Sequence, residues 1–305
     1  MVLGLIASVG TVCGRRVPIL RSVLRGHNTK EGEADLKRRL LQQAGKTLGE
    51  KEVLVADAGF ALGDVLASGV KNFVVRVAQN FTARQNTLPE YRGKGRRPEF
   101  GKIVRPLARK REGKAIAASE PTSLLKWKHN GRTLRAHRFC GLVLKTDKPG
   151  GQSFDCVVIF DPLYKQPLVL ATNLAVSAFV VWQRYRDRWA ALALPLAAKV
   201  MLGSERSYVH GAESRFRLPE LALLAGNVFS YVASGSEPIS SGFWDRAARP
   251  TCGRLRRLLA RQDFSLLPCQ EGKRRKKNSV TAHLKTGIDA HRRKRAAPNR
   301  ASTGN

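Results

Sequence analysis

The chain has 305 residues, with 55 Lys and Arg against 23 Asp and Glu and a formal net charge of +32. This length accommodates one large domain or two smaller ones. Because so large an excess of one charge repels itself in a compact fold, it indicates a polyanionic partner, with nucleic acid first and an anionic membrane surface second. Composition alone also leaves open an Arg-rich chain without a selected function.

The cysteines and the apolar segments argue against a zinc site, a signal peptide and a membrane-spanning helix. The five cysteines, widely and irregularly spaced without a CxxC pair, argue against a zinc site and fit a reduced cytoplasm. The apolar residues 1–13 follow no basic segment and precede Arg15 and Arg16, so we expect a buried strand there rather than a signal peptide. The longest uncharged run, residues 166–183, contains polar side chains and is marginal for a spanning helix, so we expect no membrane segment.

The first half of the chain predicts a βαβ unit. A helix is expected over residues 34–44, with its leucines on one side. Residues 52–57 then form a short apolar run typical of a buried strand, residues 59–68 a short helix, and residues 70–77 a second strand. Asp57 lies at the carboxyl end of the first strand, where open α/β sheets bind ligands.

The middle of the chain predicts further strands. Asn130 and Gly131 are the preferred dipeptide of a type I′ turn, so a hairpin is expected over residues 124–145. Two more strands are expected at residues 154–160 and 168–171.

The last third predicts two helices and a basic tail. Asn173 is suited to be the N-cap of a long helix that runs through Trp182, and residues 214–233 form another apolar helix. Residues 236–305 predict a linker and a disordered tail, because their Lys- and Arg-rich end has almost no bulky apolar side chain to bury. The tail suits non-specific phosphate contact, or is unselected sequence.

The long helix carries Tyr185, Arg188 and Lys199, which would read Y-x2-R-x3-E-x6-K if position 192 were Glu instead of Leu192. This pattern resembles the signature of the bacterial insertion-sequence transposases with a DDE active site and an RNase H-like core. The flanks are also similar: Val53-Leu-Val-Ala-Asp-Ala-Gly-Phe60 resembles the strand of the second aspartate, and Leu168-Val-Leu-Ala-Thr-Asn173 the entry to the last catalytic helix. The likeness covers roughly residues 1–235.

The resemblance implies an α/β fold: an RNase H-like mixed sheet flanked by helices, with a β-rich insertion and a disordered basic C-terminal tail. The implied organisation is a first part of the core at 1–117, the insertion at 118–166, a second part with the signature helix at 167–235, and the linker and tail at 236–305. The family's first aspartate belongs to a strand upstream of residues 1–25, so an N-terminally truncated core is expected.

Helix geometry gives the signature a physical meaning. At about 100° per residue, positions 185, 188 and 192 fall within about 60° of one another. Tyr185 and Arg188 are therefore expected to point toward Asp57 and to grip a DNA phosphate, with Lys199 as a further DNA contact beyond Pro195. For the helix considered without its flanking segments, the structural interpretation is that Trp182, Tyr185 and Trp189 are core aromatic residues and that the basic residues form a solvated face.

The family chemistry is phosphoryl transfer by two divalent metal ions held by three carboxylates. The resemblance therefore implies Mg²⁺ or Mn²⁺, with Asp57 as the catalytic carboxylate and metal ligand. Leu192 cannot bind a metal, and Asp187 lies about 140° around the helix from position 192 and cannot replace it.

Four functional hypotheses stay open: a DNA strand transferase with replacement acids, a catalytically impaired DNA-binding remnant, a basic RNA- or ribosome-associated protein, and a silent copy. Leu192 favours the remnant, and the Asp57 and Tyr185 motifs argue against the ribosomal alternative. The expected partners are DNA at transposon ends and a homo- or hetero-oligomer with an intact transposase, in the bacterial cytoplasm at the nucleoid.

Overall fold

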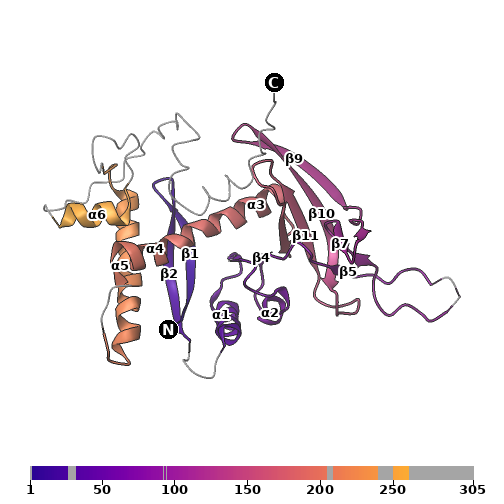
Figure 1. The fold of residues 1–305 in the computed structure, drawn as a ribbon, viewed down its shortest axis with the longest axis horizontal. Coiled ribbons are helices and arrows are strands. Elements are labelled where there is room, and N and C mark those ends of the chain that lie inside the picture. Colours follow the sequence, from indigo (N-terminus) through magenta and orange to yellow (C-terminus); the bar gives the residue numbers. More distant parts are fainter. Residues whose placement is uncertain are drawn as a thin grey trace. The chain divides into compact units, whose positions relative to one another are not determined.

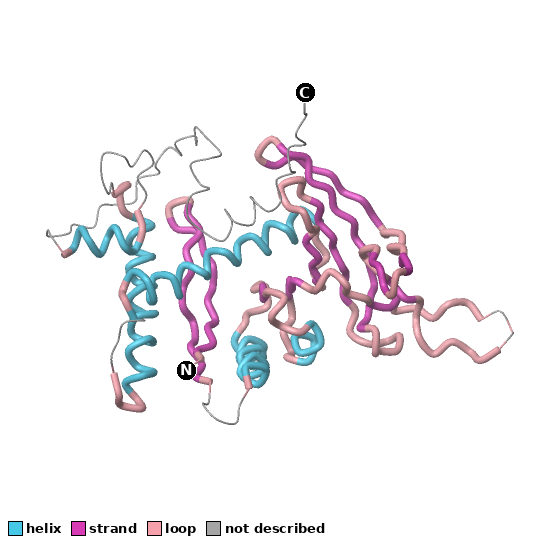
Figure 2. The backbone as a smooth tube through the Cα atoms, viewed as in Figure 1, coloured by secondary structure: helices cyan, strands magenta, loops and turns pink. Residues whose placement is uncertain are grey.

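The computed structural model describes residues 2–26, 32–91, 93, 95–204, 209–239 and 250–260. The chain divides into two compact units (Figures 1 and 2). The first, which we call the ribbon unit, contains Met1–Thr47 and Arg186–Arg274. The second, the sheet unit, contains Leu48–Tyr185 and Arg275–Asn305. Of the predicted linker and tail at 236–305, residues 240–249 and 261–305 lie outside the described residues, whereas Cys252–Leu259 form a helix that the prediction missed.

The ribbon unit combines a two-stranded antiparallel ribbon with helices. Its elements are β1 (Leu3–Val12), β2 (Arg15–Arg25), α1 (Glu33–Thr47), the 3₁₀ turn η1 (Arg188–Leu192), α4 (Ala193–Leu196), the π-helical turn η2 (Ala197–Met201), α5 (Ser214–Gly235) and α6 (Cys252–Leu259). The prediction of a strand in residues 1–13 is confirmed, although β1 is mostly half-buried rather than buried.

The ribbon is closed by a two-residue turn and is held by α5. Cys13 and Gly14 have φ of 48° and 70°, the left-handed pair that a type I′ hairpin needs. On α5, the buried Asn227 side chain donates to Pro18 O at 2.6 Å and accepts from Leu20 N at 3.0 Å. The Asn227 amide thus hydrogen-bonds two backbone groups of β2, which stabilises their burial because a buried backbone polar group without a partner is costly.

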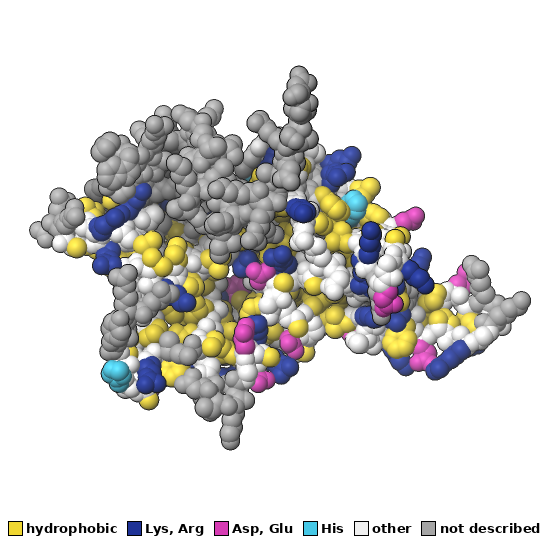
Figure 3. All heavy atoms as spheres, in the orientation of Figure 1, with side chains coloured by type: hydrophobic (Ala, Val, Ile, Leu, Met, Phe, Trp, Pro, Cys, Tyr) yellow, Lys and Arg dark blue, Asp and Glu magenta, His cyan; other side chains and the backbone are white. Residues whose placement is uncertain are grey.

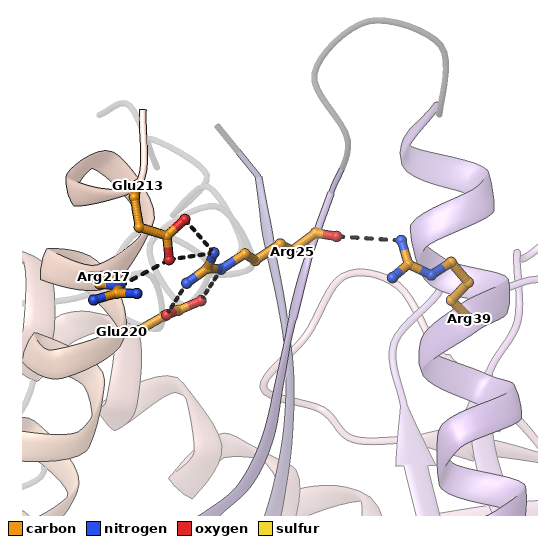
Figure 4. A network of polar contacts seen from close by, with 5 residues as sticks. All are labelled: Arg25, Arg39, Glu213, Arg217 and Glu220. Atoms are coloured by element: carbon orange, nitrogen blue, oxygen red, sulfur yellow. Dashed lines mark hydrogen bonds and ion pairs between the residues drawn. The ribbon is translucent and has the colours of Figure 1, made fainter. Parts of the chain in front are cut away.

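A polar network adds to the ribbon unit (Figure 4). The Arg25 guanidinium donates to both carboxylate oxygens of Glu220, at 2.6 and 2.7 Å, and to Glu213 at 3.0 and 3.1 Å. Arg217 also donates to Glu213, and Arg39 of α1 donates to the Arg25 backbone carbonyl. The hydrogen bonds from Arg25 lower the pKa of the Glu220 carboxyl below its ordinary value. The network therefore joins β2, α1 and α5.

The sheet unit is built on an eight-stranded mixed sheet of order β3-β4-β12-β11-β10-β5-β6, with β9 paired to β10. Its elements are β3 (Leu54–Ala56), α2 (Leu62–Ala67), β4 (Phe73–Arg76), β5 (Ala83–Gln85), β6 (Ile103–Val104), β7 (Arg109–Arg111), β8 (Lys114–Ile116), β9 (Ser123–His129), β10 (Arg132–Leu144), β11 (Phe154–Phe160), β12 (Leu168–Thr172) and α3 (Ala178–Asp187), which ends at the unit boundary. The protein is therefore of the mixed α/β class, as predicted.

Several local predictions are confirmed in this unit. β3 and β4 pair in parallel across α2, so the βαβ unit exists. The predicted hairpin is β9–β10, and its turn residues Asn130 and Gly131 have φ of 49° and 75°. β11 and β12 match the two predicted strands.

The predicted N-cap at Asn173 is wrong. α3 begins only at Ala178, after a backbone hydrogen bond from Val181 N to Ser177 O. Asn173 instead accepts from Phe73 N at 3.0 Å and donates to the Lys71 carbonyl. Its amide is used to tie β4 to the end of β12, and this long-range partner outweighs the local capping preference.

The predicted uniform signature helix is also wrong. α3 ends at Asp187, and the chain continues as the 3₁₀ turn η1, the short α4 and the π-helical η2. Pro195 has no N–H and leaves the carbonyl of Ala191 without its α-helical donor, which disfavours a regular helix there. Because a 3₁₀ turn advances about 120° per residue, positions 188 and 192 do not share the face predicted for an α-helix.

The division into units differs from the predicted domain boundaries. The units meet in sequence at 47/48 and 185/186, whereas the sequence suggested 117/118, 166/167 and 235/236. Residues 118–166 supply β9, β10 and β11 to the same sheet as β3, β4 and β12. The insertion therefore stays a prediction. Within the described part of the chain, no helix has the length and apolar character to cross a membrane.

Candidate functional site

The carboxyl ends of β3 and β4 place two charged residues side by side. Ala56 of β3 pairs with Val75 of β4 in parallel register, so the next residues along, Asp57 and Arg76, are neighbours. Alternation along each strand puts both on the face that carries Val74. Val74 belongs to the core beneath α3, and Asp57 and Arg76 are thus on the α3 face of the sheet.

One carboxylate oxygen of Asp57 gathers three donors. Asp57 Oδ1 accepts from its neighbour Ala58 N at 2.8 Å and from the Tyr185 hydroxyl at 3.2 Å. The Arg76 guanidinium lies 3.5 Å from the same oxygen. The Tyr185 residue is 4% exposed, whereas the side chains of Asp57 and Arg76 are 41% and 30% exposed. The site is therefore a partly open ion pair beside a buried phenol.

Tyr185 is held by the packing of α3. Its ring belongs to a core of sheet and α3 residues that includes Val181 and Trp182. Trp182 in turn contacts Trp127 of β9, with ring centroids 5.6 Å apart. The periodicity of α3 buries positions 178, 181, 182 and 185, so burial of one helix face brings the phenol to the sheet.

The entry to α3 is fixed by Arg138 of β10. Its guanidinium donates to Asp155 Oδ2 from Nε at 2.8 Å and from the second terminal nitrogen at 2.6 Å. It also donates to the carbonyls of Leu174 at 3.0 Å and of Val176. The two side chains are 16% and 21% exposed, so these bonds are largely shielded from water. Arg138 thereby anchors the loop before α3.

The other predicted site residues belong to the ribbon unit. The Arg188 guanidinium lies 5.2 Å from the ring centroid of Trp189 in the 3₁₀ turn. Lys199 is exposed in the π-helical turn, and Leu192 is 42% exposed. Of the predicted set, the structure brings Asp57 and Tyr185 together, while Arg188, Leu192 and Lys199 lie in the other compact unit.

Asp187 forms an ion pair with Arg16 at 3.0 Å. Two acids beyond Pro195, Glu205 and Glu213, were further possible replacements in the sequence; Glu213 binds Arg25, and Glu205 lies outside the described residues. Among the described residues, no group of three or more His, Cys, Asp or Glu side chains could hold a metal ion. The neighbours of Asp57 named above donate hydrogen bonds or positive charge to it, whereas a hard divalent ion needs further oxygen ligands. The described donor set therefore does not fit a two-metal centre.

Sequence reasoning missed Arg76, although a signal existed. It is the charged residue at the end of an otherwise apolar β4, and parallel pairing with β3 puts it beside Asp57. Arg138 had no comparable signal, because its partners Asp155 and Leu174 are defined only by strand register.

A second polar feature is the outer face of the β9–β10 hairpin. Lys126 pairs with Arg135 across the strands, and both are exposed. They alternate with Trp127 and Leu134, which face the α3 core. Like charges directly opposite one another destabilise a sheet, so this pair favours an anionic partner over a purely structural role.

Aromatic rings flank this basic face. The rings of His137 and Phe160 lie 4.8 Å apart, and the Arg135 guanidinium lies 5.9 Å from the Phe160 centroid. Burial and the charge of Arg135 lower the pKa of His137, which favours the neutral imidazole at neutral pH.

No protein-family model matches the chain, and a search of curated proteins found no significant match.

Proposed function

We propose that this protein is a DNA-binding relative of the DDE insertion-sequence transposases, with an RNase H-like core and impaired catalysis. The observation that carries the proposal is the hydrogen bond from Tyr185 to Asp57. These residues are separated by 128 positions and were each singled out from a different motif of the family pattern. Their contact supports the resemblance independently of either motif.

The arrangement has a chemical rationale. Ligands of open α/β sheets bind at the carboxyl ends of the strands, where Asp57 and Arg76 lie. The Arg76 guanidinium offers N–H donors that a phosphate oxygen accepts, while the Tyr185 hydroxyl donates to Asp57 and holds that carboxylate in place. The site is therefore suited to contact a phosphodiester.

Catalysis is impaired in this proposal because Leu192 stands where the family pattern has a glutamate. Two-metal phosphoryl transfer depends on carboxylates that hold both ions, and an isobutyl group supplies no ligand. The protein then retains DNA contact without strand cleavage, alone or together with an intact transposase at transposon ends.

The charge of the surface supports a partner with a polyanionic backbone. Lys and Arg side chains are spread over the described parts of the face in Figure 3, with acidic side chains among them. Neutralising phosphates releases counterions, so affinity for duplex DNA should fall steeply as salt rises. A binding titration of a labelled duplex at several salt concentrations tests this. An affinity that stays flat between low and moderate salt would contradict the proposal.

Loss of catalysis is tested by nicking of supercoiled plasmid with Mg²⁺ or Mn²⁺, using the parent chain, Asp57→Ala and Leu192→Glu. We expect no nicking by the parent. Nicking that disappears in Asp57→Ala would instead show a working site with replacement acids. Nicking gained in Leu192→Glu would assign the defect to that position.

The basic hairpin face favours a second candidate, a single-stranded RNA-binding protein without enzymatic activity. Basic side chains next to the His137 and Phe160 rings suit phosphate contact with base stacking. Competition between duplex DNA and single-stranded RNA for the same protein separates the two candidates. Preference for RNA, lost in Phe160→Leu, would support the second.

A further inference from the structure

We propose that Arg76 supplies at Asp57 the positive charge that a divalent metal ion supplies in a DDE site, and that its guanidinium makes a metal-independent phosphate contact. The identity of the phosphate as DNA rests on the proposed function. The assignment of Arg76 as the cation at Asp57 does not, because it concerns the sheet unit alone.

The position of Arg76 is set by the sheet and not by a flexible loop. Parallel pairing of Ala56 with Val75 makes Arg76 the cross-strand neighbour of Asp57. On its other side, Arg76 pairs with Leu170 of β12 in antiparallel register. The backbone that carries the guanidinium is thus held between two strands, 3.5 Å from the Asp57 carboxylate at its tip.

Arg76 changes what Asp57 can bind. A guanidinium near a carboxylate offsets part of its negative charge and repels an approaching divalent cation. The phenol and the backbone amide that also donate to Asp57 Oδ1 would compete with a metal ion for that oxygen. A partly exposed ion pair is weak, so its effect on metal affinity is modest. Among the described residues, no further carboxylates join Asp57 in a group that could hold a metal ion, which lowers the affinity further.

The same guanidinium has donors to spare. Arg has five N–H donors in a planar fork. Among the described residues, Arg76 forms an ion pair with Asp57 through one terminal nitrogen, Nη1. With the side chain 30% exposed, the remaining donors are available to a phosphate oxygen. Asp57 then opposes phosphate binding, because its negative charge lies beside the anion.

The direction of the change in DNA affinity on removing the Asp57 charge tests the proposal. Asp57→Asn keeps the acceptor for Tyr185 and Ala58 but removes the negative charge. If Arg76 is the cation, Asp57→Asn binds duplex DNA about two- to threefold more tightly in EDTA, and Mg²⁺ makes no difference. If Asp57 is a metal ligand, the parent binds more tightly with Mg²⁺ than with EDTA, and Asp57→Asn abolishes that gain.

Arg76→Met provides the complementary variant, with Arg76→Lys as the conservative one. Arg76→Met should weaken DNA binding about threefold or more in EDTA, and Arg76→Lys less, because lysine keeps the charge but lacks the fork. Lys71→Met is the matched control: it removes the same charge just before β4, from a side chain that is 65% exposed and paired with Glu50. The control should change affinity less than Arg76→Met does. Equal losses in both variants would overturn the specific role of Arg76.

Binding of Mn²⁺ by the free protein, followed by electron paramagnetic resonance, separates this inference from the proposed function. We expect no stoichiometric Mn²⁺ site in the parent. A tight site lost in Asp57→Asn would overturn the inference even if DNA binding is confirmed. Absence of DNA binding by the parent would contradict the proposed function, while the Mn²⁺ measurement would still decide whether Arg76 replaces the metal. Thermal melting of each variant verifies that it is folded.

Discussion

The sheet unit and the ribbon unit are stabilised in different ways. The sheet unit buries a continuous set of apolar side chains, including Phe73, Val75 and Leu170, in central strands that are buried on both faces. The ribbon unit joins segments far apart in the chain, and polar side chains such as Arg25 and Asn227 make those connections. The difference predicts that steric substitutions have the largest effect on the stability of the sheet unit, and that charged side chains contribute measurably to the stability of the ribbon unit.

The largest effect is expected for Gly101→Ala in the sheet unit. A Cβ atom on Gly101 would lie 1.8 Å from the Gln85 backbone oxygen, and a backbone atom cannot move aside as a side chain can. We expect a loss of about 3 kcal/mol in the free energy of unfolding, measured by urea denaturation. Gly63→Ala in helix α2 is the control, because the added Cβ would meet only the Leu144 side chain, at an ordinary contact distance of 3.6 Å. A small effect at Gly101 would show that this part of the sheet yields easily.

The next largest effect is expected for Arg138→Met, which tests whether the partly buried hydrogen bonds of one side chain stabilise an otherwise apolar unit. The substitution removes the donors to Asp155 Oδ2 and to two carbonyls before α3, so we expect a loss of about 2 kcal/mol on chemical unfolding. The exposed Arg135→Met, on the same strand, should change stability by less than about 0.5 kcal/mol. Equal effects in the two variants would mean that Arg138 does not anchor the entry to α3.

Gly226→Ala probes the apolar contact inside the ribbon unit. A Cβ there would lie 2.9 Å from the Ala197 Cβ and 3.4 Å from the Ala198 nitrogen, where α5 meets the π-helical turn. We expect a loss of about 1 kcal/mol, visible as a lower urea midpoint. Gly235→Ala on the same helix meets no atom within 4 Å and serves as the control. If both variants unfold alike, helix propensity and not close packing decides at Gly226.

The smallest effect is a pH dependence from Glu220. Its carboxyl pKa lies below the ordinary 4.5 because Arg25 donates hydrogen bonds to it. The ionised form therefore stabilises the fold above pH 4.5, and this contribution is lost as the pH falls through the lowered pKa. Thermal melting from neutral to acidic pH should show a steeper loss of melting temperature for the parent than for Glu220→Gln. Parallel curves would show that the network of Figure 4 does not contribute to stability.

Local chemistry determined much of this protein from the sequence alone. The turn at Asn130 and Gly131 follows from the left-handed backbone that this dipeptide accepts, and the βαβ unit ending at Asp57 follows from apolar runs separated by a short helix. The placement of Asp57 at a strand end and of Tyr185 on a helix was likewise predictable, since each depends on near neighbours.

Tertiary structure decided the remaining features, because it determines which groups from distant parts of the chain hydrogen-bond or pack with one another. Asn173 hydrogen-bonds the backbone of β4 instead of capping a helix, and the chain after Asp187 is not a regular α-helix around Pro195. The meeting of Arg76 with Asp57 required the parallel register of β3 and β4. A local pattern fixes an element when its partners are a few residues away, whereas a register, a long-range polar contact or a division into units depends on energies summed over the whole fold.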